Sequence, residues 1–138
     1  DSMKKIMIIS TLSIMLAFQS CKDYSKDTAT TGDIELISPQ QVYDAVYSTD
    51  SVQLVDVRTS EEYKISHLKG SQNICVTSSD FNEKVKTLDK NKPVYVYCKK
   101  GGRSAKAAKK LKDMGFTKIY DMDGGILLWE EKKLAIEK

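Results

Sequence analysis

The chain has 138 residues, of which 41% are hydrophobic and 30% charged, and its formal net charge is +3. This length indicates one domain, and a low net charge with adequate apolar content excludes an intrinsically disordered chain. A charge of +3 makes no strong positive field, so we expect no nucleic-acid partner, and three cysteines are too few for a disulfide-stabilised mini-fold.

The first 20 residues are typical of an export signal. Residues 1–2 precede Met3 and resemble a cloning remnant, two lysines follow, and Ile6–Phe18 contains no charged residue. An apolar run of this length suits a signal peptide and is short for a membrane-spanning helix, which needs about 20 residues. We therefore expect residues 1–20 to be a remnant and signal peptide outside the fold.

The next segment resembles the start of a bacterial lipoprotein. A serine precedes Cys21, which would be the lipidated residue, and residues 22–33 are polar, threonine-rich and without apolar period. We expect residues 21–33 to be a lipidated cysteine and a flexible tether, because two or more acyl chains anchor a protein stably. The protein would then be exported to the bacterial cell envelope, on the periplasmic or surface side. Plain secretion and a retained anchor are the alternatives.

From residue 34 onward, strand-like and helix-like segments alternate. We expect strands at 34–36, 52–57, 71–76 (a weak one), 94–97 and 118–122. Between them we expect a helix capped by Ser38 and Gln41, a short helix from 60, a helix at 80–88 and a helix at 104–114 that stops at Gly115. A last helix holds Trp129. Strands separated by helices favour an α/β domain over residues 34–138, with a parallel sheet and helices on both faces.

One loop that follows a strand carries chemistry, as expected for a parallel sheet, where ligands bind beyond the carboxyl ends of the strands. Cys98 ends a buried strand, and a short loop leads from it to the next helix. The loop residues are Lys99, Lys100, Gly101, Gly102, Arg103 and Ser104. The glycines let backbone amides point inward, and the three cations and the helix N-terminus favour a thiolate. We expect the pKa of Cys98 to be lowered, Cys98 to be a nucleophile, and the loop to hold an anion or a charged sulfur intermediate.

An ordered set of motifs, spread over residues 34–129, resembles the rhodanese-like sulfurtransferases. The motifs are Asp56-Val57-Arg58, Glu61-Glu62-Tyr63, residues 67–74, residues 97–104, Met114-Gly115-Phe116, and Gly124-Gly125-Ile126 before Trp129. The resemblance implies a five-stranded parallel sheet with helices on both faces and a Cys98 that accepts a sulfane sulfur as a persulfide. Ser66 and Cys75 depart from the family pattern, which often has glycine and proline there. We expect no cofactor and no metal, because neither a dinucleotide fingerprint nor metal-ligand spacing occurs.

The implied reaction is a two-step sulfur transfer. Cys98 takes the outer sulfur of thiosulfate or a similar anionic donor, and a thiol, cyanide or a protein cysteine then removes it. A persulfide carrier or binding module with little turnover is one alternative, and a cysteine-dependent phosphatase or arsenate reductase is another. Related phosphatases place five residues between cysteine and arginine, whereas four separate Cys98 from Arg103, and the shorter loop suits a single sulfur atom.

Several nearby residues have two readings. Arg103 either binds the donor or turns outward to pair with a carboxylate, while its N–H serves the loop. Asp56 and Arg58 are expected to form an ion pair that fixes the loops, with donor binding as the alternative. His67 is expected to be structural rather than a general base. Cys75 is expected to be a packed, inert thiol, and the alternative is that it resolves the persulfide into a disulfide.

Overall fold

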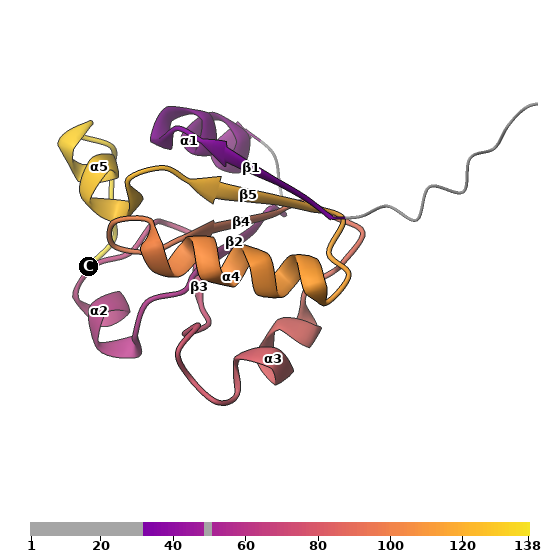
Figure 1. Ribbon diagram of the computed structural model, residues 1–138. Helices are drawn as coiled ribbons and strands as arrows, with labels where there is room; N and C mark the ends of the chain where they lie inside the picture. Colours follow the sequence, from indigo (N-terminus) through magenta and orange to yellow (C-terminus); the bar gives the residue numbers. More distant parts are fainter. Residues whose placement is uncertain (1–31, 49–50) are drawn as a thin grey trace, which may run out of the picture.

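The computed structural model describes residues 32–48 and 51–138, which form one layered α/β domain (Figure 1). The predicted signal peptide, the predicted lipidation site Cys21 and the tether up to residue 31 lie outside the described residues. Within the described ranges, no helix has the length and apolarity needed to cross a bilayer.

Strands and helices alternate along the chain. In order they are β1 (Asp33–Ile37), α1 (Pro39–Ser48), β2 (Gln53–Asp56), α2 (Ser60–Ile65), β3 (Gln72–Asn73), α3 (Phe81–Lys84), a 3-10 turn (Val85–Thr87), β4 (Val94–Tyr97), α4 (Gly102–Asp113), β5 (Lys118–Met122) and α5 (Gly125–Glu131). The five strands form one sheet in the order β1-β5-β4-β2-β3, and every pairing is parallel. The predicted five-stranded parallel sheet is confirmed, and the carboxyl ends of its strands meet at one edge.

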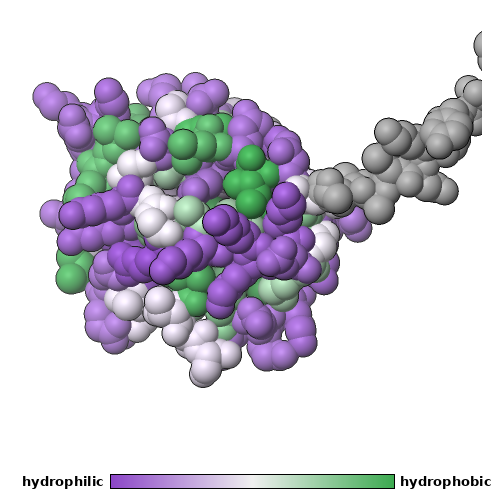
Figure 2. Space-filling model, in the orientation of Figure 1, coloured by the Kyte–Doolittle hydropathy of each residue, from purple (hydrophilic) through white to green (hydrophobic). Residues whose placement is uncertain are grey.

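Helices cover both faces of the sheet (Figure 1). On one face, Phe81 of α3 and Leu111 of α4 pack with Val96 in a buried cluster. On the other face, Val42 of α1 and Trp129 of α5 pack with Leu54. Figure 2 shows hydrophilic residues over the outward side of α4, where the lysines are exposed. The parallel strands are thus buried between two apolar layers, as their composition predicts.

Two predicted helix ends are confirmed in atomic detail. The Ser38 hydroxyl accepts the Gln41 N–H at 3.2 Å, and the Gln41 side chain accepts the Ser38 N–H at 2.9 Å, which completes the capping box. At the end of α4, Gly115 has φ +94°, and the Phe116 N–H donates to the Leu111 carbonyl at 3.1 Å. This is the Schellman stop expected from the glycine and the phenylalanine after it.

Element boundaries differ from the prediction in three places. The first strand begins at Asp33, and Gly32 before it is buried, so the tether ends earlier than residue 33. The predicted helix at 80–88 is one α-helical turn followed by a 3-10 turn. The predicted strand at 71–76 is the two-residue β3, which pairs with β2 alone at the edge of the sheet.

Candidate functional site

Cys98 lies directly after β4, at the carboxyl edge of the sheet, with its side chain buried at 1% exposure. The following loop turns back sharply because Gly101 has φ +119°, a backbone conformation that favours glycine. In this turn the Gly101 N–H donates to the Cys98 Sγ at 3.0 Å. The Ser104 hydroxyl, in the first turn of α4, lies 3.5 Å from the same sulfur. That hydroxyl donates to the Gly101 carbonyl at 3.1 Å, so the loop curls around the sulfur with the Gly101 amide as its donor, as the two glycines predict.

These donors act on the charge of the sulfur. Burial alone would raise the pKa of the Cys98 thiol, because a low-dielectric environment disfavours an anion. Hydrogen bonds from the Ser104 side chain and from the backbone amides of Ser104, Gly101 and Lys100 outweigh burial and lower that pKa below its ordinary value. The geometry therefore favours a thiolate, which is the nucleophilic form of cysteine.

Helix α5 supports the loop from its other side. The Ile126 N–H donates to the Cys98 carbonyl at 2.9 Å, and the Leu127 N–H donates to the Lys99 carbonyl at 3.2 Å. A Cβ atom on Gly125 would lie 2.3 Å from the Lys99 carbonyl oxygen, so no side chain fits there without moving the loop. The Gly124-Gly125-Ile126 motif by itself does not indicate this steric role.

Arg103 turns away from the sulfur and pairs with a carboxylate of α2. Its two terminal nitrogens donate to the two Glu62 carboxylate oxygens at 2.6 and 2.8 Å. Glu62 also accepts the Thr59 N–H in a capping box at the start of α2. The bond to Arg103 lowers the pKa of Glu62 to about 2. Of the two readings of Arg103, the structure has the outward ion pair, and this pair joins α2 to the first turn of α4.

Asp56 and Arg58 form the ion pair expected from the sequence. The guanidinium of Arg58 donates to both Asp56 carboxylate oxygens, at 2.6 to 3.0 Å, and both residues are buried. The same guanidinium donates to the Ser66 carbonyl at 2.6 Å. Arg58 is therefore held in place between the end of β2 and the loop after α2.

The predicted loop lysines are at the surface. Lys99 and Lys100 are both exposed, and Lys99 also lines a hollow of about 190 Å³ together with Ile65 and Leu127. These cations give the surface beside Cys98 a positive charge that suits an approaching anion.

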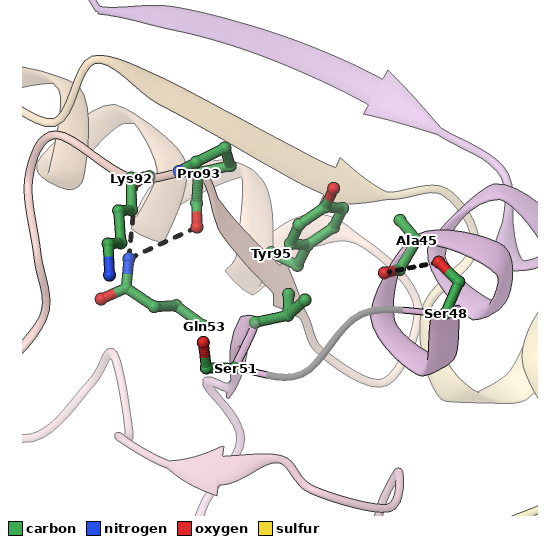
Figure 3. A pocket seen from close by; sticks show the side chains of 8 residues that line it. Ala45, Ser48, Ser51, Gln53, Lys92, Pro93 and Tyr95 are labelled. Carbon is green, nitrogen blue, oxygen red and sulfur yellow. Dashed lines mark hydrogen bonds between the residues drawn. The ribbon is translucent and has the colours of Figure 1, made fainter.

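A second hollow, of about 360 Å³, lies at the opposite edge of the sheet, near the first residues of β2 and β4 (Figure 3). Its Gln53 amide donates to the Lys92 and Pro93 carbonyls, and the Ser48 hydroxyl donates to the Ala45 carbonyl. These polar groups hold the wall of the hollow together.

Two other sequence candidates lie apart from this loop. His67 stacks on Tyr63, and its Nδ1 is 3.0 Å from the Tyr63 carbonyl oxygen, which suits a structural role. Cys75 is a free thiol 3.2 Å from the Thr77 hydroxyl oxygen, and it is partly exposed. Cys75 is therefore not the fully packed thiol that the sequence led us to expect, because β3 ends before it and the chain turns at the surface there.

Two residues shape the site in ways that the sequence does not indicate. Glu62 belongs to a family motif, but nothing in the sequence indicates that it meets Arg103, 41 residues later. Gly125 also belongs to a motif, and its close approach to the Lys99 carbonyl depends on how α5 packs. A third residue, Asp121 of β5, is a buried carboxyl group at 5% exposure, and an acidic residue inside a predicted strand is the available signal for it.

Comparison with known proteins decides the family. The model of the rhodanese-like domain matches residues 38–132, which include every strand except the first and all of the Cys98 loop. The chain belongs to the rhodanese-like domain family.

Rhodanese-like relatives include named sulfurtransferases. The thiosulfate sulfurtransferase GlpE of Pseudomonas fluorescens is 38% identical over 77 residues, which cover 55% of this chain and 68% of GlpE. The probable adenylyltransferase/sulfurtransferase MoeZ of Mycobacterium tuberculosis is 31% identical over 114 residues. That match covers 83% of this chain and only 29% of MoeZ, so this rhodanese-like chain spans little more than a quarter of that larger relative.

A solved structure has the same rhodanese-like fold. The crystal structure of a rhodanese-like domain protein from Staphylococcus aureus superposes with a TM-score of 0.64 at 26% identity, over 75% of this chain and 99% of that one.

Proposed function

We propose that this rhodanese-like domain is a sulfurtransferase that carries a sulfane sulfur on Cys98, with thiosulfate or a similar anion as donor. The observation that carries the proposal is the buried Cys98 sulfur, which accepts the Gly101 N–H at 3.0 Å and has a lowered pKa. The named sulfurtransferases among the relatives support the same chemistry.

In the first step the Cys98 thiolate attacks the outer sulfur of thiosulfate. A bond forms between the two sulfurs, the bond from the outer sulfur to the sulfonate breaks, and sulfite leaves with the electron pair. The exposed Lys99 and Lys100 attract the anionic donor. The donors that favour the thiolate, among them the Gly101 amide, then face the anionic persulfide.

In the second step an acceptor nucleophile attacks the outer sulfur of the persulfide. Cyanide would leave as thiocyanate, and a thiolate would leave as a new persulfide, with the Cys98 thiolate restored in either case. Because the donor product leaves before the acceptor reacts, steady-state kinetics should be ping-pong.

A phosphatase or arsenate reductase is a weaker candidate. Four residues separate Cys98 from Arg103, and both terminal nitrogens of Arg103 are engaged by Glu62. That arginine is turned toward α2, so it does not help to surround a tetrahedral oxyanion at the sulfur.

The test is mass spectrometry of the full chain after incubation with thiosulfate. We expect one added sulfur atom, mapped to the Cys98 peptide, and thiocyanate production when cyanide follows. Cys98→Ala should lose the adduct and lower turnover by roughly a thousandfold or more, since no other group replaces the nucleophile. Cys75→Ala is the matched control and should keep both the sulfur adduct and the turnover.

Other results of this experiment would contradict the proposal or change it to a carrier role. An unloaded wild type, or an adduct that persists in Cys98→Ala, contradicts the proposal. A full adduct with negligible turnover for thiol and cyanide acceptors would make the domain a persulfide carrier instead of an enzyme.

We also propose, from the sequence of residues 1–33 alone, that the domain is exported and anchored through a lipid on Cys21. Expression in a bacterium with a labelled fatty acid should yield a labelled, membrane-associated protein. Cys21→Ser should lose the label, whereas Cys75→Ser should keep it. An unlabelled wild type would contradict the anchor.

A further inference from the structure

The outward side of α4 carries lysines that sulfur transfer, as written above, does not use. Four of them are exposed and are called the lysine face below: Lys106, Lys109, Lys110 and Lys112. Figure 2 shows hydrophilic residues over this side of α4. Within residues 32–48 and 51–138, no carboxylate forms a salt bridge with any of the four. Their charges are therefore open to a partner from outside the domain.

The spacing of these lysines is unfavourable for the helix itself. Residues three or four positions apart are neighbours on a helix surface, so Lys106 lies beside Lys109 and Lys110. Like charges at this spacing destabilise a helix, and α4 has one acidic residue, Asp113, to set against them. A concentration of unpaired cations on one helix fits an anionic surface outside the protein.

The two faces of the sheet differ in charge. Helices α1 and α5 cover the face opposite α4 and contain no lysine or arginine within their bounds. Their charged residues are acidic: Asp44, Glu130 and Glu131. The net charge of +3 for the whole chain therefore conceals a basic side on α4 and acidic helices on the other side.

The chain enters the domain beside the lysine face. The Asp33 N–H donates to the Thr117 carbonyl, in the turn after α4, at 3.1 Å. A Cβ atom on Gly32 would lie 3.0 Å from the Lys112 Cγ. The first 31 residues, with their uncharged apolar run at 6–18, are thus joined to the domain at the carboxyl-terminal end of α4.

The length of this connection keeps α4 close to any membrane that holds the first residues. Residues 22–31 separate Cys21 from Gly32, and ten residues span at most about 35 Å. Helix α4, with 12 residues, is about 18 Å long, so the whole lysine face lies within reach of the same lipid surface.

We propose that the lysine face of α4 docks on an anionic lipid bilayer, so that the domain lies with α4 along the membrane. The exposed large hydrophobic residues among those described are Leu36, Tyr43, Ile65 and Leu127, and none belongs to α4. The contact is therefore with charged headgroups, without insertion, and is sensitive to salt. The inference goes beyond sulfur transfer and does not depend on it. A bilayer is favoured over a nucleic acid because the export-type segment attaches beside this face.

The test is acetylation of the full chain by a neutral ester, followed lysine by lysine by peptide mass. The chain is mixed with vesicles of phosphatidylcholine alone, or of phosphatidylcholine and phosphatidylglycerol in equal parts. The lysine face should react about fivefold more slowly on the anionic vesicles, the factor for one lysine drawn to such a surface. Molar salt should remove the difference, because it shortens the Debye length to about 3 Å. Lys64, Lys69 and Lys132, which are exposed on other elements, should react equally on both vesicles.

A charge-matched pair of variants separates the lysine face from net charge. The triple variant Lys106→Gln, Lys109→Gln and Lys110→Gln should lose the protection of Lys112. The control Lys64→Gln, Lys69→Gln and Lys132→Gln has the same net charge and should keep the protection of the lysine face. Both should keep thiosulfate turnover in the absence of vesicles, since none of these lysines belongs to the Cys98 loop.

Three results would overturn the inference. One is equal acetylation of the lysine face on the two kinds of vesicle, and another is equal protection of Lys64, Lys69 and Lys132. The third is protection of the lysine face by a DNA duplex but not by anionic vesicles, which would make it a nucleic-acid surface. A chain that sediments with anionic but not with neutral vesicles, with its lysine face protected, would contradict the lipid anchor and support the inference.

Discussion

At the scale of single residues, Cys98 is surrounded by backbone groups rather than by a catalytic side-chain pair. The Gly101 amide donates to the Cys98 sulfur, and the Ile126 amide of α5 donates to the Cys98 carbonyl. The Ser104 hydroxyl lies 3.5 Å from the sulfur. The reactivity of the thiol therefore depends on where the main chain runs. Substitutions that move the loop should lower activity even when they leave every polar side chain intact.

Gly125 is where this dependence can be tested. A Cβ there would lie 2.3 Å from the Lys99 carbonyl oxygen, and φ is +61°. We expect Gly125→Ala to destabilise the fold by about 2–4 kcal/mol and to lower thiosulfate turnover at least tenfold, because the loop must shift. Urea unfolding and thiocyanate production measure the two effects.

Gly70→Ala is the control for this substitution. Gly70 also has a positive φ, +76°, but its Cβ would meet no atom within 4 Å. Its cost should be about 1 kcal/mol of backbone strain, with turnover unchanged. Equal losses of turnover in the two variants would show that strain, and not contact with the loop, is responsible.

The buried ion pair gives a second prediction at this scale. Arg58 and Asp56 are both buried, and the guanidinium also bonds to the Ser66 carbonyl. Arg58→Ala should destabilise the protein by about 3–5 kcal/mol, because an unpaired carboxylate stays buried. The double variant Asp56→Asn with Arg58→Met should lose less than the single one. Denaturant unfolding measures both, and a double variant less stable than Arg58→Ala contradicts the explanation.

At the scale of elements, one ion pair joins α2 to α4 beside the active loop. Glu62 binds Arg103 through both oxygens, and the pKa of Glu62 falls from 4.5 to about 2 in the folded state. A group with a lowered pKa adds stability above its unfolded pKa, and that stability is lost as pH falls through the folded one. The window for this pair is therefore pH 4.5 down to about 2.

The free energy of unfolding should depend on Glu62 in that pH window. Glu62→Gln should lose about 1 kcal/mol at neutral pH, since the pair is partly exposed, and should show a shallower decline below pH 4.5. Glu83→Gln, which breaks the exposed pair with Lys86, is the control and should follow the wild type. Parallel declines of Glu62→Gln and wild type would contradict the assignment.

Elements with local signals were predictable from the sequence. The capping box of Ser38 and Gln41 and the glycine stop of α4 lie within six residues of chain, so sequence alone is enough to see them. The same is true of the strand–loop–helix around Cys98. Contacts between distant elements were not predictable: the Glu62–Arg103 pair and the contact of Gly125 with the Lys99 carbonyl depend on how α2, α4 and α5 pack.

At the scale of the whole molecule, the two apolar clusters share one sheet. Strands β2, β4 and β5 contribute residues to both clusters, for example Val96 to one and Tyr97 to the other. Neither face can therefore lose its packing while the other stays intact. We expect cooperative unfolding, as is usual for a domain of this size.

Trp129 makes this prediction measurable. It is the one tryptophan of the chain, and it is fully buried on the α1 and α5 side of the sheet. Its fluorescence reports that face, whereas far-UV circular dichroism reports all helices and strands. The two urea transitions should coincide. A fluorescence transition at a clearly lower urea concentration would mean that the faces unfold separately.

The central claim is that closure of the Cys98 loop holds the sulfur as an anion. The most direct measurement is the pH midpoint for alkylation of Cys98 in the wild type, resolved from the other cysteines by peptide mass. The account predicts a midpoint clearly below that of an ordinary thiol, about 8.5. A midpoint at or above that value would contradict it.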